Sequence, residues 1–278
     1  MRNLKVIIPV LFLFIIFSCT KKEIEIKDGH QKVIFNPKIT EEVINAQNTF
    51  DISNSIIEES YDKILKGTIG FRGLDCAEIS KSNSFGQFPN TFTLDFGTGC
   101  DVNDSLNFSG KILITFSGFF NHSGDSIVFE YNNFYVNGTH LEGVCIKKNL
   151  GKDTNGNRTF SKQITNAKVT KENGETTSFN SLKYSKYYRN GTPFNFNDDK
   201  FGFTGNFNGV TASGDTYNGI IKNELILPVS CGCIVSGKLE ITYNSEDTFE
   251  LDYGNGDCDK VGTLTYPDGT IEEIDVCK

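Results

Sequence analysis

Among the eight cysteines of this chain, Cys19 stands in a context that points to lipid attachment. A basic start precedes an apolar run over residues 6–17, which is too short to cross a bilayer of about 30 Å as a helix and is typical of a signal peptide. The run ends with Ile16 at position −3 and Ser18 at position −1 before the cysteine, the pattern called a lipobox. The sequence therefore predicts that residues 1–18 are a signal peptide and that Cys19 is acylated. The rival interpretation is an ordinary signal peptide that happens to contain a cysteine.

An acylated Cys19 would make a membrane the first partner of the chain. Two or three acyl chains anchor a protein stably, because each buried CH₂ contributes about 0.8 kcal/mol. Residues 19–38 are charged, mixed in sign and poor in large side chains, so we expect a flexible tether. The expected location is the cell envelope, at the outer membrane, facing the periplasm or the cell surface. The formal net charge of −8 argues against nucleic acid as a partner.

The most specific feature is a cysteine motif that occurs twice. Cys76 is followed, after fourteen residues, by TFTLDFGTGCD, and Cys233 is followed, again after fourteen residues, by TFELDYGNGDCD. This matched spacing predicts the disulfides Cys76–Cys100 and Cys233–Cys258. Each would close a loop of about 25 residues, which contributes roughly 3 kcal/mol in the chain-entropy model.

The two predicted bridges leave three of the seven cysteines that follow Cys19. Cys231 begins the second copy and Cys277 ends the last expected strand, so a third bridge between them is expected, which leaves Cys145 as a buried thiol. A zinc site is the rival explanation for these cysteines. Only three histidines are present and no CxxC pair occurs, so the donor set that zinc prefers is poor.

The duplicated LD[FY]GxGxCD motif behind a lipobox resembles a group of uncharacterised cell-envelope lipoproteins of Bacteroidetes. The resemblance covers the chain from Cys19 onward. It implies an envelope location and an all-β body, and it brings with it no activity, substrate or catalytic residue.

Two further kinds of site are suggested by short patterns. Asp252, Asp257 and Asp259 surround glycines, and Ca²⁺ takes six to eight oxygen ligands from such loops. Tight turns use the same residue types, so turn chemistry is the alternative interpretation. Ser105 and Ser126 each lie in an Asp-Ser-apolar triplet, which matches the O-glycosylation sequon of exported Bacteroidetes proteins.

The sequence predicts no catalytic residue, and it predicts no cofactor other than the calcium ion considered above. It contains no nucleophile elbow, zinc-protease or phosphate-loop motif, although a carboxylate pair for glycoside hydrolysis would be set by the fold and stays open. Aromatic side chains near residue 190 could bind sugars, or else pack in the core or in cross-strand pairs. These aromatic residues are Tyr184, Tyr187, Tyr188, Phe194 and Phe196.

Residues 39–66 form the only segment with a helical pattern. Apolar residues recur there at spacings of seven, seven, four and three, which predicts a short helical segment weakened by the polar residues 53–55. The apolar stripe consists of Val43, Phe50, Ile57, Tyr61 and Ile64.

Residues 67–278 read as a β-domain. Asn-Gly pairs, the strongest short hairpin signal, begin at 137, 155, 173, 190 and 208. They predict an antiparallel meander of long strands, about 13 residues or 43 Å each, forming a sandwich or a large curved sheet. The alternative is two shorter strands in each interval. SGKILITF before Asn137 echoes SGKLEITY near the end, so two related units are expected, at about 67–140 and 225–278.

Together these features predict a membrane-anchored lipoprotein with a non-catalytic binding or structural role. One alternative is a surface protein that binds or acts on glycans. Another is a carrier of lipid or of another apolar ligand. The possible partners besides the membrane are therefore a glycan, a lipid or a protein.

Overall fold

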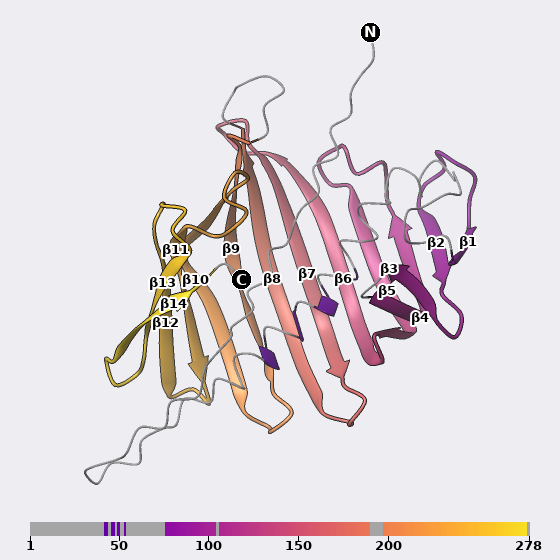
Figure 1. The fold of residues 1–278 in the computed structure, drawn as a ribbon. Helices are drawn as coiled ribbons and strands as arrows, with labels where there is room; N and C mark the ends of the chain where they lie inside the picture. The colour runs from indigo at the N-terminus through magenta and orange to yellow at the C-terminus, as the bar shows by residue number, and fades with distance from the viewer. Residues whose placement is uncertain are drawn as a thin grey trace.

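The computed structural model describes residues 42–43, 46–47, 49–50, 53, 76–103, 106–189 and 197–276. Its 14 strands form one sheet in which every pairing is antiparallel. Along the path β1-β2-β4 and onward to β14, each strand lies beside the next strand of the chain, except that β3 is passed over. β3 lies beside this path and pairs with β4. Figure 1 shows the strands side by side in one curved sheet. The predicted all-β meander is confirmed, as a single large sheet and not as a sandwich.

The central strands are long, as the spacing of turns predicted. β6 has 14 residues, and β7, β8 and β10 have 13 each. The strands are β1 (Glu78–Lys81), β2 (Asn90–Asp95), β3 (Cys100–Asn103), β4 (Leu106–Phe116), β5 (Ser126–Val136), β6 (Thr139–Lys152), β7 (Arg158–Thr170), β8 (Thr176–Tyr188), β9 (Lys200–Val210), β10 (Thr216–Pro228), β11 (Ser236–Tyr243), β12 (Asp247–Asn255), β13 (Val261–Thr265) and β14 (Ile271–Asp275).

Of the five Asn-Gly pairs from which the meander was predicted, three lie in turns. Asn137 and Gly138 both adopt positive φ, 47° and 76°, in the two-residue connection between β5 and β6. The pairs that begin at Asn155 and Asn173 lie in the turns between β6 and β7 and between β7 and β8. The pair that begins at Asn190 lies outside the described residues.

The prediction of a turn at Asn208 is wrong, because this pair lies inside β9. A Cβ on Gly209 would lie 2.1 Å from Ser178 O and 2.5 Å from the Tyr217 hydroxyl oxygen, so the glycine allows a close approach between strands. The turn itself falls at residues 211–215, where Gly214 has a φ of 92°.

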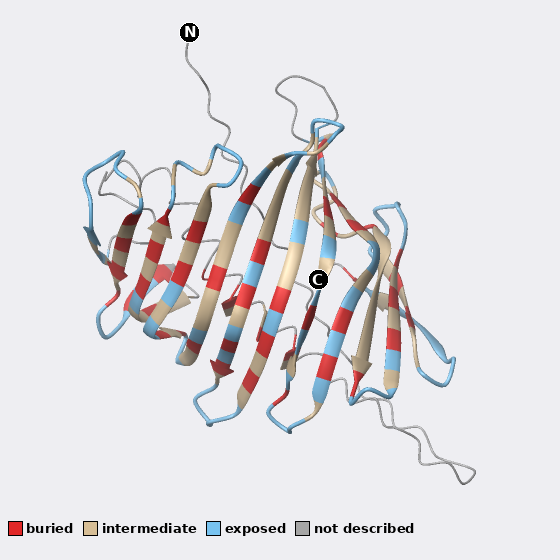
Figure 2. Cartoon of the chain, turned by 180° about the vertical axis from the view of Figure 1, so that it is seen from behind, coloured by how far each residue is buried: buried red, intermediate tan, exposed pale blue. Residues whose placement is uncertain are grey.

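The buried side chains gather on one face of the sheet, called here the inner face. Partners in an antiparallel ladder point to the same side, so a register row shows which residues share a face. One such row runs from Phe129 through Cys145, Ile164 and Ser181 to Phe207, and every member is buried. Figure 2 shows buried positions alternating with more exposed ones along the strands. The opposite face is called the outer face.

Helical residues near the N-terminus pack against the inner face. Val43, Ala46 and Phe50 are buried in the same core as the sheet, and the Phe50 ring makes edge contacts with Tyr131 and Phe179. The predicted helical stripe is therefore confirmed at its first two positions, while its positions from 57 onward lie outside the described residues. In the part of the chain that the structure describes, no helix is long and apolar enough to span a membrane.

Polar contacts fasten the same helical residues to the sheet. A Glu42 carboxylate oxygen accepts hydrogen bonds from the Thr177 hydroxyl and, at 2.7 Å, from the Ala212 backbone N–H. Lys183 Nζ donates to Gln47 Oε1 at 3.1 Å. Residues more than 130 positions apart in the chain are thus joined, so the helical residues form part of the domain.

The two copies of the motif form equivalent ladders. Asp95 is in register with Lys111 and Asp252 with Lys238, and each carboxylate lies near the amine, at 2.6 Å and 3.2 Å respectively. One paired threonine contact repeats as well, with hydroxyl–hydroxyl distances of 2.8 Å and 3.0 Å. The threonine pairs are Thr91 with Thr115 and Thr248 with Thr242.

The chain order of these ladders is reversed between the two copies. In the first, the motif strand β2 precedes its partner β4, and in the second the motif strand β12 follows its partner β11. The glycine of each SGK echo has positive φ, 80° at Gly110 and 106° at Gly237. The same two-stranded unit is therefore built at both flanks of the sheet from opposite chain directions.

Each flank also carries a disulfide, and one of the two predicted in the motif is correct. Cys76 and Cys100 are bonded, with a Cα–Cα distance of 5.6 Å. The second pairing was wrong, because Cys258 is bonded to Cys231, with a Cα–Cα distance of 5.8 Å, and not to Cys233. Spacing alone could not separate two cysteines two residues apart. The side chain of Cys233 is buried in the core, whereas Cys258 lies in an exposed loop.

The predicted bridge between Cys231 and Cys277 is consequently wrong as well. Cys277 lies outside the described residues, and Cys233 is itself disulfide-bonded. Cys145, on β6, retains a buried thiol as expected. The cysteines after Cys19 thus stabilise the sheet mainly at its flanks.

Candidate functional site

The predicted modification sites are placed only in part. Cys19 and Ser105 lie outside the described residues. Ser126 begins β5, where its backbone N–H donates to Ser117 Oγ at 2.7 Å and its side chain is half-buried. Lipidation of Cys19 and glycosylation of the two serines stay predictions.

The three aspartates suggested for calcium have other partners. Asp252 Oδ1 and Asp259 Oδ1 each accept a hydrogen bond from the backbone N–H two residues on, at 3.0 Å and 3.1 Å, and Asp252 also pairs with Lys238. Within the described ranges, no group of three or more His, Cys, Asp or Glu side chains could hold a metal ion. The structure therefore does not bring Asp252, Asp257 and Asp259 together as ligands: the carboxylates of Asp252 and Asp259 accept hydrogen bonds in turns, and that of Asp252 also forms a ladder ion pair.

The tyrosines near residue 190 lie at the end of β8 and are divided between the two faces. Tyr187 is on the inner face, where its hydroxyl donates to Asp199 and its ring contacts Phe201. The pKa of Tyr187 is raised to about 12, mainly by partial burial and secondly by the hydrogen bond to Asp199. Tyr184 and Tyr188 are on the outer face. The two phenylalanines of this group, Phe194 and Phe196, lie outside the described residues.

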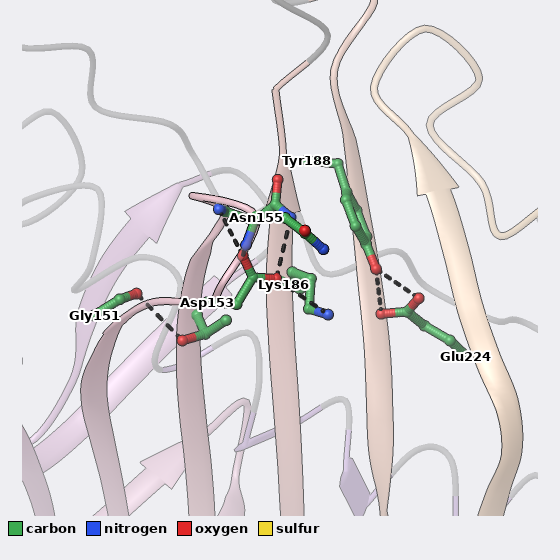
Figure 3. Close-up of polar contacts among 8 residues, drawn as sticks. Gly151, Asp153, Asn155, Lys186, Tyr188 and Glu224 are labelled. Atoms are coloured by element: carbon green, nitrogen blue, oxygen red, sulfur yellow. Dashed lines mark hydrogen bonds and ion pairs between the residues drawn. The ribbon is translucent and has the colours of Figure 1, made fainter.

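The outer-face tyrosines belong to a group of side chains called here the tyrosine patch, which Figure 3 shows in part. Tyr188 donates its hydroxyl to the Glu224 carboxylate of β10, at 2.9 Å and 2.7 Å from the two oxygens. The strand between them, β9, carries Gly202 at this level. A Cβ on Gly202 would lie 2.3 Å from Glu224 Oε1 and 2.8 Å from Tyr188 Cε2, so the glycine makes room for the contact. The patch consists of Tyr184, Lys186, Tyr188, Lys200 and Glu224.

Two lysines contact the Tyr188 ring. Lys186 Nζ lies 5.5 Å from the ring centroid and Lys200 Nζ lies 5.3 Å from it. An ammonium group over an aromatic face is attracted by the ring quadrupole. The ring is thus held between two cations and a carboxylate, which fixes its orientation.

Asp153 holds the Lys186 side chain from the turn between β6 and β7. Its Oδ2 lies 3.4 Å from Lys186 Nζ, and its other oxygen accepts the backbone N–H groups of Asn155 and Asn157 at 2.9 Å each. The Asn157 side-chain amide also donates to Asp153. This hydrogen bond is the largest of the effects that lower the pKa of the Asp153 carboxyl, and the two backbone hydrogen bonds add to it. The turn therefore presents a fixed carboxylate to the lysine at neutral pH (Figure 3).

The chemistry of this patch favours binding over catalysis. Partial burial, followed by the Glu224 hydrogen bond, raises the pKa of Tyr188, so the phenol keeps its proton at neutral pH. Tyr184, four residues before Tyr188 on the same face, is 43% exposed and presents an open ring. An exposed ring beside fixed donors and acceptors can stack on a ligand while the polar groups orient it.

Sequence reasoning found the tyrosines of this patch and missed Lys186, Lys200 and Glu224, as well as Gly202, which makes room for them. Lys200 could not have been placed, because the predicted turn at Asn190 would pair Tyr188 with residue 193, whereas its register partner is Lys200. Glu224 could not have been placed, because two extra residues of β10 are accommodated between Ile220 and Leu225.

A second feature of the outer face is a shallow hollow over β4, β5 and β6. Its volume is about 380 Å³, and Glu130, Glu142 and His140 are among its lining residues. The His140 ring stacks on the Tyr135 ring, with 4.7 Å between the ring centroids. The hollow is open and polar, and it offers acceptors without an exposed aromatic ring.

No protein-family model matches the chain, and no match to it is found among curated proteins or solved structures. The resemblance to Bacteroidetes lipoproteins therefore stays a prediction.

Proposed function

We propose that the chain is a lipid-anchored protein of the bacterial cell envelope that binds carbohydrate, without catalysis, through the tyrosine patch. The observation that carries the binding role is the exposed ring of Tyr184 beside side chains held by hydrogen bonds and ion pairs. A sugar ring has an apolar face that stacks on tyrosine, and its hydroxyls suit carboxylate and ammonium partners. Because the polar groups are already oriented, little side-chain entropy is lost on binding.

The alternative carrier function receives less support from the described residues. Phe92, Phe129 and Phe179 of the inner face are no more than 2% exposed, and Phe50 of the helical segment packs against this face. A ligand there would have to displace rings that already fill the space. The outer face offers a ligand direct access.

Replacing Tyr184 by alanine is expected to weaken carbohydrate binding at least about tenfold, because a stacked aromatic ring contributes on the order of 1.5 kcal/mol. The full chain would first be screened on an array of neutral and acidic glycans, and the best ligand would then be titrated by calorimetry.

Ile220→Ala is the matched control, because Ile220 is 38% exposed on the outer face of β10 and is not part of the patch. This variant should bind as the unchanged chain does. Absence of any glycan ligand, or equal affinity of the Y184A variant, would rule out the patch as a carbohydrate site.

The anchor is tested separately. Cells grown with an alkyne-labelled fatty acid should yield a labelled chain in the membrane fraction, because acyl chains would hold it there. The Cys19→Ala variant should carry no label. Equal labelling of both chains, or no labelling of either, would contradict acylation at Cys19.

A further inference from the structure

Three phenylalanines form an exposed aromatic cluster at one end of the sheet, called here the phenylalanine tip. Phe85 and Phe119 are 54% and 40% exposed, and Phe88 is half-buried beneath them. Phe119 lies 5.8 Å from Phe85 and 4.7 Å from Phe88, between ring centroids. Phe85 and Phe88 come from the loop between β1 and β2, and Phe119 from the loop between β4 and β5. Large apolar groups gathered in the open indicate a contact surface.

Both loops are held in place by internal hydrogen bonds. Asn90 is buried, and its side chain accepts from Asn83 N–H at 3.1 Å and donates to Asn83 O at 3.0 Å. In the second loop, Asn149 Nδ2 of β6 donates to Phe120 O at 3.1 Å, and Gly124 N–H donates to Asn149 O at 2.8 Å. The rings are therefore displayed by ordered backbone.

Cationic side chains surround the same end of the sheet. β6 and β8 end there and β7 and β9 begin there, at the upper end in Figure 1. Lys152 and Arg158 share the face of Tyr187, whereas Lys148 lies on the other face, in the row of Tyr184. The cations near this end are Lys148, Lys152, Arg158, Lys186, Arg189 and Lys200.

The opposite end of the same strands is acidic. Its turns carry Glu172, Glu175 and Asp215 against one lysine, Lys171, which pairs with Glu175 at 3.0 Å, and the chain as a whole has a formal net charge of −8. Carboxylates lie at the cationic end too, but Asp125, Asp153, Asp198, Asp199 and Glu224 are buried or half-buried, whereas five of the cations are exposed: Lys148, Lys152, Arg158, Arg189 and Lys200. The exposed charges are therefore mainly positive at the cationic end of the strands and mainly negative at the other. This asymmetry orients the molecule toward an anionic surface.

We infer that the phenylalanine tip and the surrounding cations contact an anionic lipid surface, with the sheet standing on it end first. Cations on both faces of the strand ends suit a flat charged plane that meets the sheet end-on. A partner seated on one face would meet only half of them. Aromatic rings settle at the boundary of headgroups and acyl chains, and lysines there bind anionic headgroups. The contact goes beyond the proposed function and depends on neither carbohydrate binding nor the acyl anchor.

The test uses the absence of tryptophan from the chain, which makes any introduced indole a single reporter. The full-length variants Phe119→Trp and Ile271→Trp would be mixed with vesicles of phosphatidylethanolamine and phosphatidylglycerol containing brominated lipid. Ile271 is 66% exposed on β14, so its variant is a matched reporter at a distant edge with the same N-terminus. We expect a blue shift and quenching several-fold larger for F119W than for I271W.

Two further variants separate the causes. Lys148→Gln with Lys152→Gln in the F119W chain should remove most of the quenching, as should raised salt or neutral phosphatidylcholine vesicles. Tyr184→Ala should leave the quenching unchanged, so failure of the carbohydrate site is distinguishable from failure of this contact. Phe85→Trp provides a second reporter if F119W does not fold.

Equal quenching of the F119W and I271W variants on anionic vesicles would overturn the inference. So would quenching that persists unchanged on neutral vesicles or after the lysine substitutions. No quenching of either tip reporter would overturn it too, and a protein partner for the tip would then be the interpretation to test.

Discussion

Replacement of Phe50 by alanine is expected to lower the free energy of unfolding by about 3–5 kcal/mol, the range for losing a fully buried phenylalanine ring. Phe50 has 0% exposure and makes edge contacts with Tyr131 and Phe179, which lie on strands three positions apart in the sheet. The cavity would open where the helical segment meets the inner face. Urea denaturation followed by far-ultraviolet circular dichroism measures the loss.

Phe85→Ala is the control, because it removes the same atoms from a ring that is 54% exposed. Its cost should stay below about 1 kcal/mol, as for surface substitutions in general. If both variants lost the same amount, or if F50A lost less than about 1 kcal/mol, the helical segment would not be part of the folded core.

A methyl group at position 110 is expected to destabilise the chain by about 2–5 kcal/mol. Gly110→Ala forces alanine into a φ of 80°, which costs about 1–2 kcal/mol. It also places the new Cβ 1.8 Å from Asn133 O, so the ladder between β4 and β5 must shift, at a further cost of about 1–3 kcal/mol. Gly237→Ala should behave alike, since its Cβ would lie 2.4 Å from Glu224 O.

Gly174→Ala separates the two contributions. Gly174 has a φ of 86°, and a Cβ built there meets nothing within 4 Å. This variant should show the conformational cost alone, about 1–2 kcal/mol. The same denaturation series measures all three variants. Equal losses for G110A and G174A would mean that the close approach of backbone at position 110 has no energetic consequence.

The fold could be predicted from sequence because local signals agreed with one another. Turn chemistry at Asn137 and near Asn155 and Asn173 set the length of the strands, and alternation of apolar residues set their inner face. The exception at Asn208 has a physical cause: glycine serves a close approach of strands as well as it serves a turn, and sequence does not separate the two uses.

The site was less predictable, because it depends on register across strands. Tyr188 and Glu224 are 36 residues apart, and their contact relies on extra residues within β10 and on Gly202 in the strand between them. The error over Cys233 has a similar origin. The difference between Cys231 and Cys233 lies in burial, which a count of residues cannot show.

The meander order of the sheet has a consequence for the way the protein folds. Because nearly every strand pairs with its neighbour in the chain, the contacts are local, and the entropy of closing long loops is small for a protein made of strands. Such a sheet can grow strand by strand from any starting hairpin, as repeat proteins do, and it would open first by fraying at its ends. The disulfides Cys76–Cys100 and Cys231–Cys258 lie near those two ends, so they restrain the regions of the sheet that would open first.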